Sequence, residues 1–103
     1  MRSGFENEWK VTGKVYYLKE LTGEFSASVK IEGVASRPDV FSSSILKVAC
    51  LLTSKAYDEA KRLGMAVRRN ATLSGHLESW STADGKPKIY FIADRVEKVG
   101  GWE

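Results

Sequence analysis

Apolar and polar residues alternate along most of this chain, which is the pattern of half-buried β-strands. The alternation predicts a first strand from Trp9 to Leu18 and a second from Phe25 to Glu32, joined by a turn at Leu21–Glu24. Gly13, inside the first strand, indicates a bulge or a sharp bend. The nearly continuous apolar run Ile45–Leu52 predicts a third strand that is buried on much of both faces.

The segment Ala71–Ala93 predicts a long β-hairpin, because its alternation is interrupted by turn residues at Asp84–Gly85. Alternation places Leu77 on an apolar face, and Trp80 and His76 on the opposite, polar face. Lysines flank the turn. A large aromatic ring on a polar face, beside a basic turn, indicates a surface for a flat ligand.

One short helix is predicted between the third strand and the hairpin. Thr53 and Ser54 can cap a helix over Lys55–Leu63, and Gly64 can end it. The segment Met65–Asn70 is then expected to re-enter the sheet.

The segment Gly33–Ser44 predicts a long exposed loop, because an Arg-Pro-Asp sequence and three consecutive serines disfavour regular structure. Phe41 lies in this loop. Its ring is expected either to reach a ligand or to anchor the loop.

Three strands, a helix and two more strands form the order of elements in the OB-fold, a five-stranded Greek-key barrel with its helix between strands three and four. A different small β-barrel is the structural alternative. Within the 103 residues, the barrel is expected over residues 7–99. Residues 1–6 are expected to be a disordered N-terminus, and residues 100–103 the C-terminal end.

Composition favours a polyanionic partner. The net charge is +3, and residues 34–70 hold seven basic residues against three acidic ones. Cys50 is the only cysteine and lies in an apolar run, so we expect a small core residue in a reducing compartment. Neither a signal peptide nor a membrane-spanning run is recognisable, which indicates a cytoplasmic protein.

Three segments resemble the bacterial single-stranded DNA-binding protein family in their order and spacing. Asn7–Val15 is similar to that family's opening strand, Leu46–Ala56 to its third strand and the start of its helix, and Leu73–Ser79 to its fourth strand. The resemblance spans Asn7–Val99. It implies a homodimer or homotetramer of OB-folds that binds single-stranded DNA by base stacking and phosphate contacts, in replication, repair or recombination, with replication proteins as possible partners.

The sequence departs from this family at three places, one of which is an insertion of about four residues between Gly64 and Leu73. Ile45–Leu52 contains none of the family's stacking aromatics, and Gly101–Glu103 does not continue into its acidic tail. A short, tailless domain is also similar to primosomal replication protein N, a dimeric relative. Two alternatives follow: an accessory OB-fold that acts mainly through protein contacts, and an RNA-binding OB-fold.

The candidate nucleic-acid-binding residues are aromatic rings and cations expected on the surface, because rings stack on bases and cations bind phosphates. Trp80 is the strongest candidate, whereas a tyrosine on a barrel strand often buries its ring. Lys14, Lys47 and Lys86 lie where the resemblance implies polar or basic contacts. The full set comprises Trp80, Tyr90, Tyr16, Phe41, Lys14, Lys47, Lys86, Lys88, Arg37, Arg68 and Arg69.

The sequence indicates a binding protein and not an enzyme. It contains no glycine-rich phosphate loop and no nucleophile with an evident base. His76 is the only histidine and is expected on the surface, with no second histidine or cysteine to complete a metal site. No cofactor is expected.

Overall fold

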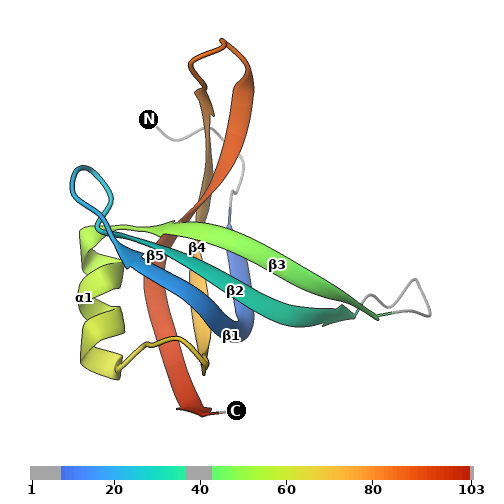
Figure 1. Cartoon of the computed structure of the whole chain (residues 1–103), viewed down its shortest axis with the longest axis vertical. Coiled ribbons are helices and arrows are strands. Elements are labelled where there is room, and N and C mark those ends of the chain that lie inside the picture. Colours follow the sequence, from blue (N-terminus) through green and yellow to red (C-terminus); the bar gives the residue numbers. More distant parts are fainter. Residues whose placement is uncertain (1–7, 37–42, 103) are drawn as a thin grey trace.

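The structure of the chain, a computed structural model, describes residues 8–36 and 43–102 and consists of strands and one helix (Figure 1). The β4–β5 hairpin and the far ends of β2 and β3 extend beyond the barrel in different directions (Figure 1). The elements are β1 (Trp9–Glu20), β2 (Ala27–Ser36), β3 (Ser43–Leu52), α1 (Ser54–Leu63), β4 (Arg69–Ser81) and β5 (Pro87–Trp102).

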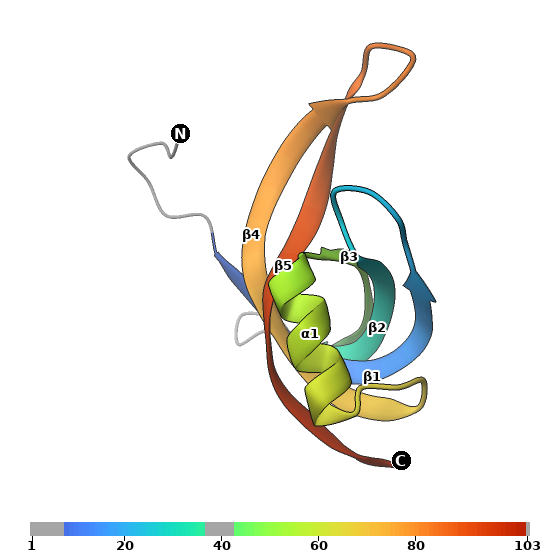
Figure 2. The ribbon, with the colours of Figure 1, turned by 90° about the vertical axis from the view of Figure 1, so that its left-hand side faces the viewer.

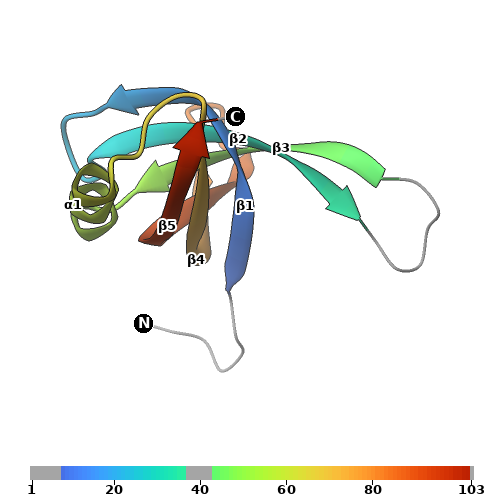
Figure 3. The ribbon, with the colours of Figure 1, turned by 90° about the horizontal axis from the view of Figure 1, so that it is seen from below.

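The five strands close into a barrel in the order β1-β2-β3-β5-β4. All neighbouring strands are antiparallel except β3 and β5, which pair in parallel where Cys50–Leu52 faces Phe91–Ala93. Seen from below, the strands enclose the interior and α1 lies at one side (Figure 3). A closed five-stranded barrel with its helix between β3 and β4 confirms the predicted OB-fold.

The interior of the barrel is filled by the apolar positions of the alternating strands, which removes their side chains from water. Cys50 is 1% exposed, as predicted, and its burial raises the pKa of the thiol to about 12. The largest fully buried side chains are Ile31, Leu52, Leu73, Ile92, Val15, Val29 and Val96.

A β-bulge in β1 changes which residues face outward. Val15 pairs with Ile31 but Tyr17 pairs with Lys30, so Tyr16 is the extra residue. Alternation had placed Tyr17 with the apolar positions of β1, which is wrong, because the bulge leaves both tyrosines on the outside. The predicted bulge at Gly13 lies instead at Tyr16.

Gly13 lies where β1 passes from its pairing with β4 to its pairing with β2. An added Cβ would lie 2.6 Å from the carbonyl oxygen of Glu32, so the glycine lets β1 and β2 approach closely. A residue with a side chain would force the two strands apart at this point.

Both ends of the long loop predicted over Gly33–Ser44 are strand. β2 continues to Ser36 and β3 begins at Ser43, with these two residues paired. A serine keeps its backbone donor and acceptor, so the ladder extends through a composition that local propensity alone disfavours. Arg37 and Phe41 lie outside the described residues.

The helix has the predicted caps. Thr53 accepts a hydrogen bond from the backbone N–H of Ala56 at 3.2 Å, and Gly64 ends the helix in the left-handed conformation, with φ of 80°. The expected return to the sheet comes later than predicted. Arg68, which also has φ of 80°, turns the chain before β4 begins at Arg69.

The helix α1 lies against β5 (Figure 2). The buried carboxylate of Glu59 binds α1 to this strand. Glu59 is 8% exposed and accepts hydrogen bonds from Arg95 Nε at 3.0 Å and from the backbone N–H of Val96 at 3.0 Å. Burial alone would raise the pKa of Glu59, but these hydrogen bonds and the charge of Arg95 outweigh it and lower the pKa.

Replacing Glu59 by Ala should reduce the free energy of unfolding by about 2 kcal/mol at neutral pH, because the Val96 N–H loses its acceptor. The stabilising contribution of a carboxyl with a lowered pKa is present above about pH 4.3 and is lost as pH falls through the folded-state pKa. Urea unfolding at pH 7 and in acid measures both effects. Asp58→Ala, at a side chain 78% exposed, is the control and should change stability by less than about 0.5 kcal/mol. Equal losses in the two variants would refute the anchoring role of Glu59.

Candidate nucleic-acid interface

The outer surface of β1, β2 and β3 continues onto the β4–β5 hairpin as one sheet, which we call the outer face. Tyr17 pairs with Lys30, and Lys30 pairs with Ala49 on β3. Residues directly opposite one another in a sheet project to the same side, so these three form one row on the outside. The parallel pairing of β3 with β5 joins the sheet to the β4–β5 hairpin, although Ile92 at this contact is itself buried. Barrel closure therefore joins residues from all five strands.

Three aromatic rings and one lysine gather where the hairpin leaves the barrel, and we call them the hairpin cluster: Phe25, Trp80, Tyr90 and Lys88. The Trp80 ring lies 4.5 Å from the Tyr90 ring and 5.5 Å from the Phe25 ring, measured between centroids. Lys88 Nζ lies 5.3 Å from the centre of the Tyr90 ring. Trp80 lies opposite Lys88 in the register, on the predicted face.

Alternation predicted that the Trp80 ring would be exposed, but two neighbouring rings cover part of it. Trp80 is half-buried between Phe25, from the β1–β2 loop, and Tyr90, from β5. The contact joins the β1–β2 loop to the β4–β5 hairpin. Tilted rings of this kind attract each other by about 0.5–1.5 kcal/mol beyond the area they bury. A partly exposed stack of rings remains at the base of the hairpin.

A second group of rings and lysines, the barrel cluster, lies on β1, β2 and β3. Tyr16 and Tyr17 are 40% and 37% exposed. Lys30 Nζ lies 4.8 Å from the centre of the Tyr17 ring, and Lys47 Nζ lies 5.9 Å from the centre of the Tyr16 ring. Each pair offers a flat apolar surface with a cation beside it. This combination suits a nucleotide, which has a flat base and an anionic phosphate.

The outer face is more basic than acidic. Its lysines are Lys14, Lys19, Lys30, Lys47 and Lys88, and its carboxylates are Glu32, Glu78 and, at its edge, Asp94. Lys47 forms an exposed ion pair with Glu32 at 3.8 Å, whereas no carboxylate among the described residues lies within ion-pair distance of Lys30 or Lys88. These two ammonium groups can therefore bind phosphate without breaking an internal pair.

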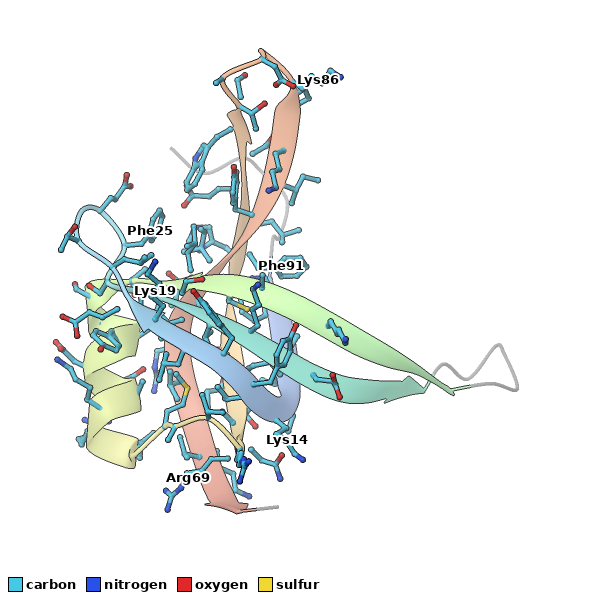
Figure 4. All side chains as sticks on the ribbon, viewed as in Figure 1. Lys14, Lys19, Phe25, Arg69, Lys86 and Phe91 are labelled. Carbon is cyan, nitrogen blue, oxygen red and sulfur yellow. The ribbon has the colours of Figure 1, made fainter. Side chains whose placement is uncertain are left out.

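Other predicted site residues lie away from the two clusters. Lys86 is at the tip of the hairpin, and Arg69 lies at the opposite end of the molecule (Figure 4). Arg69 donates a hydrogen bond to the Gly64 carbonyl at 3.3 Å, and Arg68 precedes it in the chain. Lys14 lies at the same end as Arg69 (Figure 4).

The hairpin tip that carries Lys86 is a tightly bonded turn. Thr82 N–H donates to the Lys86 carbonyl at 2.8 Å, and the Asp84 carboxylate accepts from the Thr82 hydroxyl and from Lys86 N–H. These hydrogen bonds, led by that from Thr82, lower the pKa of Asp84. The turn presents the Lys86 side chain from a fixed backbone.

The structure adds three residues that the sequence did not single out for the site: Tyr17, Lys30 and Phe25. Tyr17 was assigned to the core because the bulge at Tyr16 is not visible in the alternation. Lys30 was recognised only as a polar strand position. Phe25 was taken as the first core residue of the second strand, but that strand begins at Ala27. An aromatic residue directly after a glycine-containing turn was the signal that could have identified it.

Comparison with known proteins supports the fold. No protein-family model matches the sequence, and no curated protein matches it. Among solved structures, the chain is similar to a small single-stranded DNA-binding protein from Mycoplasma pneumoniae, with a TM-score of 0.63, 11% identity, and coverage of 91% of this chain and 94% of that one. It is also similar to a Plasmodium falciparum SSB in complex with ssDNA, with a TM-score of 0.57, 18% identity, and coverage of 96% and 95%. At these identities, the similarity shows a shared fold.

Residues 8–36 and 43–102 contain neither a cluster of metal ligands nor a membrane-spanning helix. Their histidine, cysteine and acidic side chains form no group of three or more that could hold a metal ion. No helix in this part of the chain combines the length and the apolar character needed to cross a bilayer.

Proposed function

We propose that this chain binds single-stranded DNA with little sequence preference. The observation that carries the proposal is the outer face, on which two clusters combine partly exposed aromatic rings with lysines. Every base has a flat π surface and every nucleotide a phosphate, so such a face binds any sequence. Stacking is worth about 1–3 kcal/mol per base, and a few rings therefore suffice for useful affinity.

The similar structures support the same ligand. One is described as a single-stranded DNA-binding protein and the other was solved with ssDNA bound, and both share the barrel on which the outer face is built. We infer a role in replication, repair or recombination, in which the chain holds a strand without chemical change. A role in RNA binding is tested by the same experiment.

The direct test is a fluorescence anisotropy titration with labelled oligo-dT, single-stranded RNA and duplex DNA of equal length. We expect oligo-dT to bind more tightly than the duplex, because a paired base cannot stack on a protein ring. Tighter binding of RNA than of oligo-dT would identify RNA as the ligand in place of DNA. Equal binding of all three would indicate simple charge attraction and contradict the proposal.

Trp80 should contribute to binding through its ring. Trp80→Ala should weaken oligo-dT binding by about 1–3 kcal/mol, and Trp80→Phe should retain much of the affinity because a flat ring remains. Tyr57→Ala is the matched control, since Tyr57 also lies beside a lysine, at 4.7 Å from Lys61 Nζ, but belongs to α1. Thermal melting of each variant separates lost binding from lost packing. Normal binding by a less stable Trp80→Ala would show that the ring only packs the hairpin.

Lys30 and Lys88 should supply phosphate contacts. On single strands, the slope of log affinity against log salt is about −0.7 per phosphate neutralised, so Lys30→Ala with Lys88→Ala should flatten it by about 1.4. The control is Arg62→Ala with Lys98→Ala, which removes the same charge from α1 and from the far half of β5. If both double variants change the slope equally, only the net charge matters and the outer face has no special role.

We also infer that the chain self-associates. What supports this is the other side of the hairpin, where Ile89 is 62% exposed and lies on the same face as Leu77 and Phe91. Leu77 and Phe91 are partly buried, and together with the exposed Ile89 they form an apolar surface of the kind that packs against a second chain.

Light scattering at micromolar concentration should report a dimer or tetramer, and Ile89→Asp should shift it toward monomer without loss of folding. Ser79→Asp, directly opposite Ile89 in the register, tests whether charge anywhere on this face has the same effect. A wild-type monomer at this concentration would contradict self-association.

A further inference from the structure

His76 lies between two carboxylates at the edge of the outer face. Its Nδ1 lies 2.6 Å from Asp94 Oδ2 on β5, and its Nε2 lies 2.6 Å from Glu78 Oε2 on β4. The imidazole side chain is 30% exposed. His76 lies at the surface, as expected, but both of its ring nitrogens have partners.

These two contacts imply that the imidazole is charged. An ionised carboxylate only accepts hydrogen bonds, and a neutral imidazole has a single N–H to donate. Both contacts can be hydrogen bonds to carboxylates only when both ring nitrogens carry protons. Partial burial opposes the charge on His76, but the hydrogen bonds and negative charges of Asp94 and Glu78 outweigh it and raise the pKa above its ordinary value.

The arrangement does not suit a metal ion. The carboxylates of Asp94 and Glu78 approach opposite nitrogens of the ring, so they do not converge on one point with a free nitrogen. A cation would have to displace the imidazole from both contacts.

Most of the other charged groups near His76 form ion pairs that do not include His76, Glu78 or Asp94. They line a hollow of about 570 Å³ beside the ring, together with Asp94. Lys10 of β1 is paired with Glu97 of β5 at 3.1 Å, and Arg95 of β5 is paired with Glu59 of α1 at 3.0 Å. The remaining charged residue of the hollow, Glu8, is acidic. Neutralisation of Glu78 and Asp94 therefore depends on His76.

Glu78 connects this group to the candidate interface. It lies directly opposite Tyr90 in the β4–β5 register, on the same face as Trp80. With His76 charged, the histidine and its two carboxylates carry one net negative charge. With His76 neutral, they carry two, and one of the short contacts loses its hydrogen bond. The additional negative charge appears beside the hairpin cluster.

We propose that protonated His76 neutralises Glu78 next to the stacking rings, so that the affinity of the outer face for single-stranded DNA falls as His76 loses its proton. The proposal rests on the proposed function, because it concerns phosphates bound along that face. Repulsion between a freed carboxylate and a nearby phosphate provides the physical cause.

The same group affects folding without any ligand. A histidine with a raised folded-state pKa stabilises the fold fully below its unfolded pKa of about 6.5, and this stabilisation is lost as pH rises through the folded-state pKa. As pH rises through this range, the melting temperature of the wild type should therefore fall relative to that of His76→Gln. A proton NMR titration of the only histidine gives its pKa directly, and we expect a value above that of a histidine peptide. A value at or below that of the peptide would overturn the proposal, whether or not DNA binds.

The binding experiment measures the affinity for oligo-dT from pH 5.5 to 9 at constant ionic strength. Wild-type affinity should fall about fivefold across the titration of His76, which is roughly the effect of one unit charge near a phosphate in a water-like medium. His76→Gln should bind with little dependence on pH. Glu78→Gln should bind more tightly than wild type at high pH because the repelling charge of Glu78 is absent.

The outcomes separate the two proposals. If oligo-dT binds but the affinity of the wild type changes no more with pH than that of His76→Gln, the effect of His76 on binding is refuted and the proposed function stands. If oligo-dT fails to bind at every pH, both proposals fail as statements about binding. The NMR and melting results would then still show whether His76 is charged.

Discussion

The short parallel contact between β3 and β5 is the constraint on which the rest of the structure depends. Only Cys50–Leu52 and Phe91–Ala93 take part, yet this contact closes the sheet into a barrel. Closure allows one interior to hold the apolar side chains of all five strands, and it leaves the outward side chains as a continuous surface. It also places the base of the β4–β5 hairpin beside β3. Without it, the five strands would form one open sheet with β3 and β5 at its two edges.

Local irregularities give this surface its chemistry. The bulge at Tyr16 turns two adjacent tyrosines toward solvent, and Lys30 and Lys47 from neighbouring strands lie near their rings. The β1–β2 loop brings Phe25 against Trp80. Each feature departs from the regular pleat that the hydrophobic pattern describes. The barrel provides the scaffold, and the bulge and the β1–β2 loop place rings and cations where nucleotides can contact them.

The sequence was sufficient for the architecture because alternation, capping residues and turn residues all indicated the same elements. Trp80 could be assigned to the correct face, since its register follows from the hairpin turn. Tyr17 could not, because a single extra residue at Tyr16 inverts the alternation that follows it. The partners of His76 could not be predicted either, since Asp94 reaches it across a strand pairing whose register shifts between Ser74 and Gly75.

Mapping the bound strand by NMR is the measurement that tests the account most directly. In a proton–nitrogen correlation spectrum, addition of oligo-dT should shift the Trp80 indole N–H and the backbone amides of Tyr17, Lys30 and Tyr90. Amides of α1 and of Ile89, on the other side of the hairpin, should change little. Shifts concentrated on α1, or on the end of the molecule that carries Arg69, would contradict the assignment of the outer face as the binding surface.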